Sequence, residues 1–265
     1  MKGHLHVTCA VGANGQSYLR EQSFRAPLHL SKPHFDAEAL VLNIVNPTAG
    51  IFDDDEIELD VRVEPSARLV LSTPSSSRIY RSRNGGPAKV RQNVRVGEGA
   101  FVEFFPEPFI PHAGARFQQR NDLRVAESGG LLFFEWLTPG RVASGETFLY
   151  DELQWDTDVR LDEKLIIREC YTLRPDDFSL SSIRMSFDTA HYISCVVVGD
   201  FAFPHDKIQS LGNDSVYIGC GPLCTGGWTV KTLCADSVHA RRIMASLRTM
   251  LYRAMNRPKP HLGRF

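Results

Sequence analysis

Residues 56–64 alternate strictly between charged and apolar side chains, and this pattern constrains the fold more than any other feature of the sequence. Every odd position is apolar (Ile57, Leu59, Val61 and Val63), and every even position is charged. Successive side chains on a β-strand point to opposite faces, so one face of this segment is buried and the other is solvated. The segment therefore predicts a strand that covers a hydrophobic core on one side only.

Similar short runs recur along the chain and predict further strands. Turn-forming pairs such as Asn84-Gly85 and Gly129-Gly130 lie between them, and such pairs favour the tight turns that follow strands. Many short strands without helices between them exclude a doubly wound α/β fold and predict a mainly β chain. The runs are residues 68–72, 90–96, 100–105, 131–137, 146–155, 165–168, 192–198, 216–220 and 228–234.

One amphipathic helix is predicted after Asp236, which is a favoured N-cap residue. Pro258 and Pro260 prevent the helix from continuing. A shorter helical turn is predicted at residues 204–211. The apolar positions of the main helix, at helical spacing, are Ile243, Leu247, Met250, Leu251 and Ala254. Its remaining surface is expected to carry Arg241, Arg242, Arg248 and Arg253.

The composition indicates a globular chain without a strong charge bias. Of the 265 residues 43% are hydrophobic, and the formal net charge is −1, so nothing attracts the chain as a whole to nucleic acid or an anionic membrane. No linker rich in Gly, Ser or Pro divides the sequence, and we expect a single domain over residues 1–265. No apolar run has the length of a signal core or a membrane span. We therefore expect a cytoplasmic protein with six reduced cysteines.

Two clusters invite a metal-binding interpretation. Asp53, Asp54 and Asp55 could hold a divalent cation, but the Asp/Asn alternation and glycine of a calcium loop are missing, and a solvated turn is favoured. Cys220 and Cys224, followed by Cys234, could hold a soft metal, but the spacing does not match a zinc knuckle. Packing is the favoured interpretation of these cysteines.

Catalytic motifs are absent from the sequence. It contains no Gly-x-Ser-x-Gly nucleophile elbow, no phosphate-binding loop and no dinucleotide fingerprint. A non-enzymatic protein is expected, and the alternative is an uncharacterised hydrolase that uses residues 53–55 or Glu146. In segment 137–148, Arg141 could pair with Glu146 across a tight turn, or Glu146 could face a polar channel.

Several segments, taken in order, resemble the urease accessory protein D family (UreD, called UreH in some organisms). They include Asn46-Pro47 with the turn into residues 55–60, and Thr73-Pro74 followed by Tyr80-Arg81. Gly140-Arg141, followed by Gly145-Glu146-x-Phe148, is similar to another motif of the family. The order of matching segments runs along almost the whole chain, from residues 26–28 to the arginine-bearing helix.

The resemblance implies a β-rich superhelical scaffold that binds apo-urease and the accessory proteins F and G. Its implied task is nickel delivery into the urease active site, with transient Ni²⁺ and no tightly bound cofactor. Matched acidic positions make Asp55, Asp60 and Glu146 candidates for lining a nickel route. Tyr80, Arg81, Gly140, Arg141 and Gly145 match family motifs, and Arg241, Arg248 and Arg253 are candidate contacts for partner proteins.

The sequence also departs from the family pattern. The turn at residues 48–55 lacks the usual pairs of glycines and carries three aspartates instead, which changes its backbone freedom and its charge. A scaffold that serves a different metalloenzyme is therefore a second hypothesis.

Overall fold

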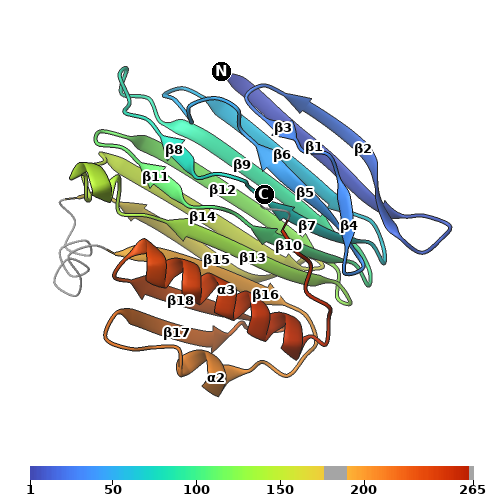
Figure 1. Ribbon diagram of the computed structural model, residues 1–265. Coiled ribbons are helices and arrows are strands. Elements are labelled where there is room, and N and C mark those ends of the chain that lie inside the picture. Colours follow the sequence, from blue (N-terminus) through green and yellow to red (C-terminus); the bar gives the residue numbers. More distant parts are fainter. Residues whose placement is uncertain (176–189, 263–265) are drawn as a thin grey trace.

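The computed structural model describes residues 1–175 and 190–262, and the strands in these ranges form two facing sheets (Figure 1). The seven-stranded sheet has the order β15 (Lys164–Leu173), β14 (Glu152–Leu161), β12 (Arg116–Val125), β9 (Ala88–Val96), β6 (Glu56–Val63), β1 (Lys2–Val11) and β2 (Ser17–Arg25).

The main path of the eleven-stranded sheet is β17 (Val216–Pro222), β18 (Gly227–Cys234), β16 (His191–Val198), β13 (Gly130–Leu137), β10 (Phe101–Phe105), β7 (Arg68–Ser72), β5 (Ala39–Val45) and β3 (His29–Leu30). Short strands extend this sheet: β4 (His34–Asp36) pairs with β5, β11 (Phe109–Pro111) pairs with β13, and β8 (Ser77–Ile79) pairs with β11.

The chain passes back and forth between the two sheets as it advances. After β5 it enters the seven-stranded sheet at β6, returns at β7, and repeats the pattern through β9, β10, β12 and β13. The central strands of each sheet therefore run parallel, as β6, β9, β12 and β14 do and as β5, β7, β10 and β13 do. Strands nearer the ends of the sheets pair antiparallel, such as β1 with β2, β14 with β15, and β16 with β18. Here the crossover that parallel pairing requires is a strand of the opposite sheet. The predicted mainly β, superhelical scaffold is confirmed, and its strands form two layers.

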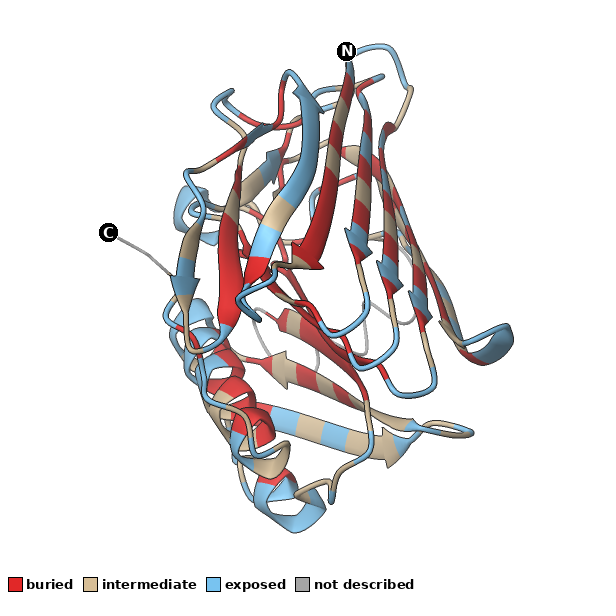
Figure 2. Ribbon diagram, turned by 90° about the vertical axis from the view of Figure 1, so that its right-hand side faces the viewer, coloured by how far each residue is buried: buried red, intermediate tan, exposed pale blue. Residues whose placement is uncertain are grey.

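The inner faces of the two sheets enclose the larger hydrophobic core (Figure 2). In β6, Ile57, Leu59, Val61 and Val63 are at most 8% exposed, while the charged positions between them point outward. The alternation in the sequence is thus confirmed as a one-sided strand. In contrast, β13 is buried at every position, because both faces of the eleven-stranded sheet are covered at this point.

Helix α3 (Ser237–Ala254) packs on the outer face of the eleven-stranded sheet and forms a second core there (Figure 1). Asp236 caps it as predicted, since its side chain accepts hydrogen bonds at 2.8 Å from the backbone N–H groups of Val238 and His239. The predicted short helical turn is also present as α2 (His205–Gln209). No helix in the described parts of the chain has the length and apolar character needed to cross a bilayer.

The structure corrects the placement of Arg248, which the sequence pattern assigns to the exposed surface of α3. This side chain is buried, and its guanidinium forms two hydrogen bonds with Glu103 on β10, at 2.5 and 2.7 Å. Arg248 also donates to the Pro260 carbonyl, and Tyr252 donates to Glu103. Both charges are satisfied inside the protein, so Arg248 fixes the helix to the sheet and is not part of the exposed surface.

A second correction concerns residues 146–155, which were predicted to form one strand. Strand β14 begins only at Glu152, and residues 146–151 form an irregular loop after the short 3-10 helix η1 (Val142–Ser144). Phe148 has a positive φ of 53° and donates its backbone N–H to the Pro139 carbonyl. Alternating aromatic residues are buried here by a loop, which sequence periodicity cannot distinguish from a strand.

We predict that Arg248→Met destabilises the protein by about 3–5 kcal/mol, because it leaves the buried Glu103 carboxylate without its counter-charge. Arg242→Met, on the exposed side of the same helix, is the control and is expected to change stability by less than about 0.5 kcal/mol. Urea denaturation of both variants measures the difference. Equal stabilities would contradict the assignment of Arg248 as an anchor of α3.

Candidate functional site

Four loops that are far apart in the sequence meet at one end of the two sheets, where β8 and β11 lie in Figure 1. Ile51 forms a backbone bridge with Ile79, and Arg81 forms one with Ala115. The N–H of Gly114 donates to the carbonyl of Leu149 at 2.8 Å. These pairings join residues 50–52, 78–81, 112–115 and 138–151 into one assembly, which we call the loop cluster.

Three rings in contact form the centre of the loop cluster. Phe52 stacks on Tyr80 with ring centroids 4.7 Å apart, and Tyr80 lies against His112 at 4.5 Å. The close packing depends on Gly50, because a Cβ atom at this position would lie 2.5 Å from the carbonyl oxygen of Arg78. Gly50 therefore allows the first loop to approach the second.

Arg141 and Glu146 form an ion pair beside these rings. Nε of Arg141 donates to Oε2 of Glu146 at 2.8 Å, and Nη2 donates to Oε1. The backbone N–H of Ala113 donates to the same carboxylate at 3.0 Å. The Arg141 guanidinium holds the pKa of Glu146 below its ordinary value, and the carboxyl side chain is 17% exposed. The pairing across the turn is confirmed.

His112 is buried between Tyr80 and this ion pair. Its Nε2 atom has no hydrogen-bond partner within residues 1–175 and 190–262. Burial, followed by the nearby Arg141 guanidinium, lowers the pKa of His112, so the imidazole is neutral at pH 7. A neutral imidazole beside a carboxylate suits a transition-metal ion, but Arg141 opposes a bound cation at this point.

The acidic stretch at residues 53–55 forms a turn held by its own carboxylates. Asp55 is 4% exposed, lies 2.6 Å from the Met1 amino nitrogen, and accepts the backbone N–H of Phe52 at 2.9 Å. Asp53 accepts the backbone N–H of Arg83 at 3.0 Å. The turn interpretation is confirmed, although Asp55 is buried rather than solvated. In the described ranges, no group of three or more His, Cys, Asp or Glu side chains could hold a metal ion.

Asp60 lies apart from the loop cluster. It is on the outward face of β6 and accepts a hydrogen bond from the Asn93 side chain at 2.8 Å. The structure therefore places Asp55 and Glu146 at the same end of the molecule and Asp60 on the outer surface of the seven-stranded sheet.

The cysteines that invited a soft-metal interpretation do not form a common site within the residues that the structure describes. Cys234 is buried, and burial raises the pKa of its thiol to about 11. Cys220 is half-buried, and Cys224 is exposed. Packing is confirmed for Cys234.

A fully buried carboxylate lies between the two sheets, at Glu135 on β13. Its Oε1 accepts hydrogen bonds from Gln119 at 2.9 Å, Asn121 at 2.8 Å and Trp155 at 2.6 Å. Burial raises the pKa of Glu135, while these donors and the Lys231 ammonium favour its charged form. A polar group at this depth is stable only when it is hydrogen-bonded.

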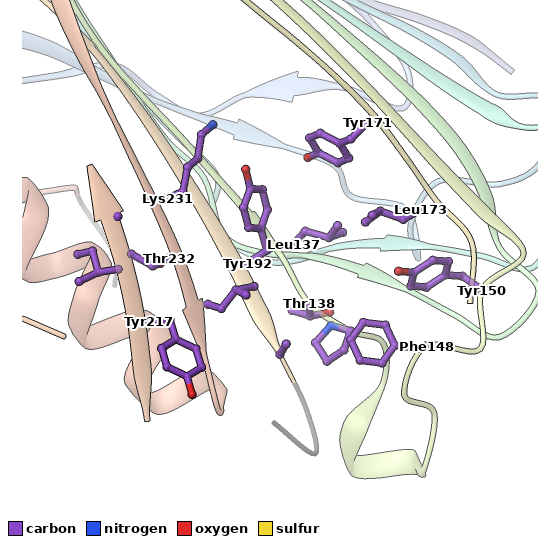
Figure 3. Close-up of a pocket in the computed structure, with 15 residues that line it drawn as sticks. Leu137, Thr138, Phe148, Tyr150, Tyr171, Leu173, Tyr192, Tyr217, Lys231 and Thr232 are labelled. Atoms are coloured by element: carbon purple, nitrogen blue, oxygen red, sulfur yellow. The ribbon is translucent and has the colours of Figure 1, made fainter. Parts of the chain in front are cut away.

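A cavity of about 580 Å³ adjoins both this network and the loop cluster, and Figure 3 shows the side chains that line it. Tyr171 lies at its inner side and stacks on Trp155, whose indole N–H reaches Glu135. Thr138 and Phe148, from the loop cluster, lie at its other end. Lys231 supplies a positive charge at the rim and donates to Glu169 and to Ser194. The lining is otherwise largely apolar and aromatic: Leu137, Pro139, Tyr150, Leu173, Ala190, Tyr192, Tyr217, Ile218, Gly219, Thr232 and Leu233.

Comparison with known proteins assigns the chain to a family. Residues 1–264 match the model of the UreD urease accessory protein family. The chain belongs to the UreD family. The urease accessory protein UreD of Opitutus terrae is 33% identical over 96% of both chains. UreD of Acetivibrio thermocellus is 25% identical over 95% of this chain and 97% of its own length. UreH of Helicobacter hepaticus is 25% identical over 88% of this chain and 91% of its own length.

Six of the residues that match UreD motifs come together in the loop cluster, whereas Asp60 lies apart from it. Gly140 allows the chain to pass close to the next loop segment, because a Cβ atom there would lie 2.4 Å from the carbonyl oxygen of Glu146. Gly145 ends η1 in the left-handed conformation, with φ of 76°. Arg81 packs its side chain against Gly114. The assembled motif residues are Tyr80, Arg81, Gly140, Arg141, Gly145 and Glu146.

Sequence reasoning missed His112, Glu135 and the cavity beside them. The available signal for Glu135 was a single carboxylate inside the otherwise apolar run 130–137. A charge in a segment too apolar to be solvated indicates a buried polar site. No comparable pattern marked His112, which is defined by contacts with distant loops.

We predict that Glu146 stabilises the fold mainly above pH 4–5. Its folded-state pKa is lowered, so its contribution is present above the ordinary value of about 4.3 and is lost as the pH falls through the lower folded value. The difference in unfolding free energy between the wild type and Glu146→Gln is therefore expected to be constant from about pH 7 to 5 and to shrink below that range. A difference independent of pH down to the acid transition would contradict the ion pair.

We predict the opposite pH dependence for Glu135. Its folded-state pKa is raised, so its contribution is greatest below about pH 4.3 and declines as the pH rises through the folded value. The difference in unfolding free energy between the wild type and Glu135→Gln is therefore expected to shift against the wild type as the pH rises from about 4 to the folded-state pKa of Glu135. Denaturant titrations at several pH values measure this change, and a rise in relative stability over that range would contradict the burial effect.

Proposed function

We propose that this UreD-family chain is a cytoplasmic urease maturation factor that binds apo-urease together with the accessory proteins F and G. In this role it assists nickel insertion and catalyses no reaction of its own. Membership of the family over residues 1–264 carries the proposal. The assembly of the family-motif residues into one loop cluster supports it.

Nickel is cargo in this proposal and not a resident cofactor. Carboxylates bind nickel more weakly than thiolates or imidazoles do, and weak binding suits transfer. Glu146 and Asp55 lie in or beside the loop cluster, so either carboxylate can meet a passing cation only after releasing its present partners. Asp60 lies on the outer surface. It would therefore contact nickel only outside the protein interior, before the ion enters the passage or after it leaves.

The passage that we propose runs from the loop cluster through the aromatic cavity toward Glu135. Thr138 and Phe148 line the cavity and belong to the same loop as Arg141 and Glu146. Tyr171 and the Trp155 indole then lead to the buried carboxylate. A carboxylate at the inner end would attract a cation into a region whose lining is largely apolar and aromatic and whose one ammonium group, on Lys231, is paired with Glu169.

Protein partners would bind mainly to surfaces away from this passage. On α3, Arg253 and Arg242 are exposed and suit contact with a partner. Arg241 is partly committed to Glu107, with two hydrogen bonds of 3.0 and 2.8 Å. Strands β2 and β17 end the two sheets, and their edges can pair with an added strand.

Deletion and restoration of the gene test the proposed function, in cells that carry the urease structural subunits and the other accessory genes. Urease activity and the nickel content of urease are expected to fall together on deletion and to recover together on restoration. Full urease maturation without this chain would contradict the proposal and would direct the search to another metalloenzyme client.

In the restored cells, we predict that Glu146→Gln lowers urease activation about tenfold, equivalent to about 1.4 kcal/mol. The amide removes the charge that pairs with Arg141 and that could attract a cation. Glu163→Gln, at the exposed turn between β14 and β15, is the matched control and should leave activation unchanged. Normal activation by Glu146→Gln, at equal levels of soluble protein, would exclude a role for this carboxylate.

A further inference from the structure

Four arginines lie side by side on the outer face of the seven-stranded sheet. The strand register places Arg62 of β6 beside Arg95 of β9, Arg95 beside Arg124 of β12, and Arg124 beside Arg160 of β14. Neighbouring strands are about 4.8 Å apart, so the four positions span about 14 Å. We call this set the arginine row. It lies toward the C-terminal ends of its strands, whereas the loop cluster adjoins the start of β6.

Half of the arginine row has internal counter-charges. Arg124 pairs with Asp122 at 3.2 Å, and Arg160 pairs with Asp122 at 3.1 Å and with Asp158 at 3.2 Å. The Arg124–Asp122 pair is partly exposed, and such a pair contributes little to stability, so Arg124 can exchange Asp122 for another partner. Arg160 is held more firmly, because its partner Asp158 is only 7% exposed.

The other half of the arginine row has no such compensation. Within residues 1–175 and 190–262, no carboxylate lies within ion-pair distance of Arg62 or Arg95, and both side chains are exposed. Asp60, two residues before Arg62, accepts a hydrogen bond from Asn93 instead. Like charges directly opposite each other on adjacent strands are destabilising. The arrangement therefore contributes nothing to folding and suits an external anion.

The spacing of the arginine row selects among anionic ligands. Carboxylates at positions i, i+3, i+7 and i+10 of an α-helix are about 4.5–6 Å apart along the axis and span about 15 Å. In an extended strand, side chains on the same face are about 6.7 Å apart. A line of carboxylates on a strand would therefore fall out of step with the arginines, which are about 4.8 Å apart. Asp60, Asn93, Asp122 and Asp158 occupy the register row two residues before the arginines on the same face, and Asp122 and Asp158 are ion-paired with arginines. The unpaired positive charge is therefore confined to a narrow line, which fits one row of carboxylates better than a broad polyanion such as nucleic acid.

We infer that the arginine row is a docking site for an acidic α-helix of a partner protein. The helix lies across β6, β9, β12 and β14, with one line of carboxylates above the guanidinium groups. Arg62 and Arg95 supply the uncompensated charge, and Arg124 and Arg160 extend the contact. The inference depends on the charge pattern of this face and not on nickel delivery.

Fluorescence anisotropy with the full chain tests this inference with three labelled probes. The first is an alanine-based helical peptide with glutamates at i, i+3, i+7 and i+10, the second has the same composition with its glutamates spread around the helix, and the third is a single-stranded oligonucleotide. The first peptide is expected to bind best. Arg62→Glu combined with Arg95→Glu should weaken its binding about tenfold or more.

Arg91→Glu is the matched control, because Arg91 lies on the same face of β9, is exposed, and also has no carboxylate within ion-pair distance in the described chain. It is expected to leave peptide binding unchanged. The double variant should unfold at the same or a higher temperature than the wild type, since it removes like-charge repulsion. If the double variant does not fold, Arg62→Gln combined with Arg95→Gln replaces it in the same titration.

Three results would overturn the inference. Equal affinity for both peptides, or equal weakening by Arg91→Glu, would show general charge attraction without a defined docking site. Tighter binding of the oligonucleotide, lost in the same double variant, would show a nucleic-acid surface instead. Failure of the first peptide to bind at low ionic strength would exclude an acidic helix as the occupant.

Discussion

The two sheets bury their inner faces against each other, and the rest of the structure depends on this packing. The chain alternates between the sheets, so each added strand contributes apolar side chains to the same core, and the strands of the seven-stranded sheet turn a polar face to the outside. This arrangement leaves charged side chains in register across parallel strands, which produces the arginine row. It also brings the loops at one end of successive strands together, which produces the loop cluster.

The two faces of the scaffold differ in their chemistry because different elements cover them. The outer face of the eleven-stranded sheet is packed by α3, and the buried pair of Arg248 and Glu103 fixes that helix in place. The outer face of the seven-stranded sheet remains open and charged. In the interior, the hydrogen-bonded Glu135 carboxylate interrupts an otherwise apolar region, and the aromatic cavity separates it from Glu146.

The sequence predicted those features that depend on local pattern. The alternation at residues 56–64 identified a one-sided strand, and Asp236 marked the start of α3, because each follows from neighbouring side chains. The sequence did not predict that Arg248 is buried, since its counter-charge Glu103 lies far away in the chain. It named Arg141 and Glu146 from the segment 137–148 as well as from the family resemblance, but their neighbour His112 is defined by tertiary contacts that no local pattern encodes.

The most direct measurement is the nickel content of urease isolated in complex with this chain and the accessory proteins, with the wild type and Glu146→Gln compared. The account predicts equal amounts of bound urease and less nickel with the variant, because the substitution changes the loop cluster and not the docking surfaces. Equal nickel loading with the two chains, or failure of the wild type to bind apo-urease, would contradict the account.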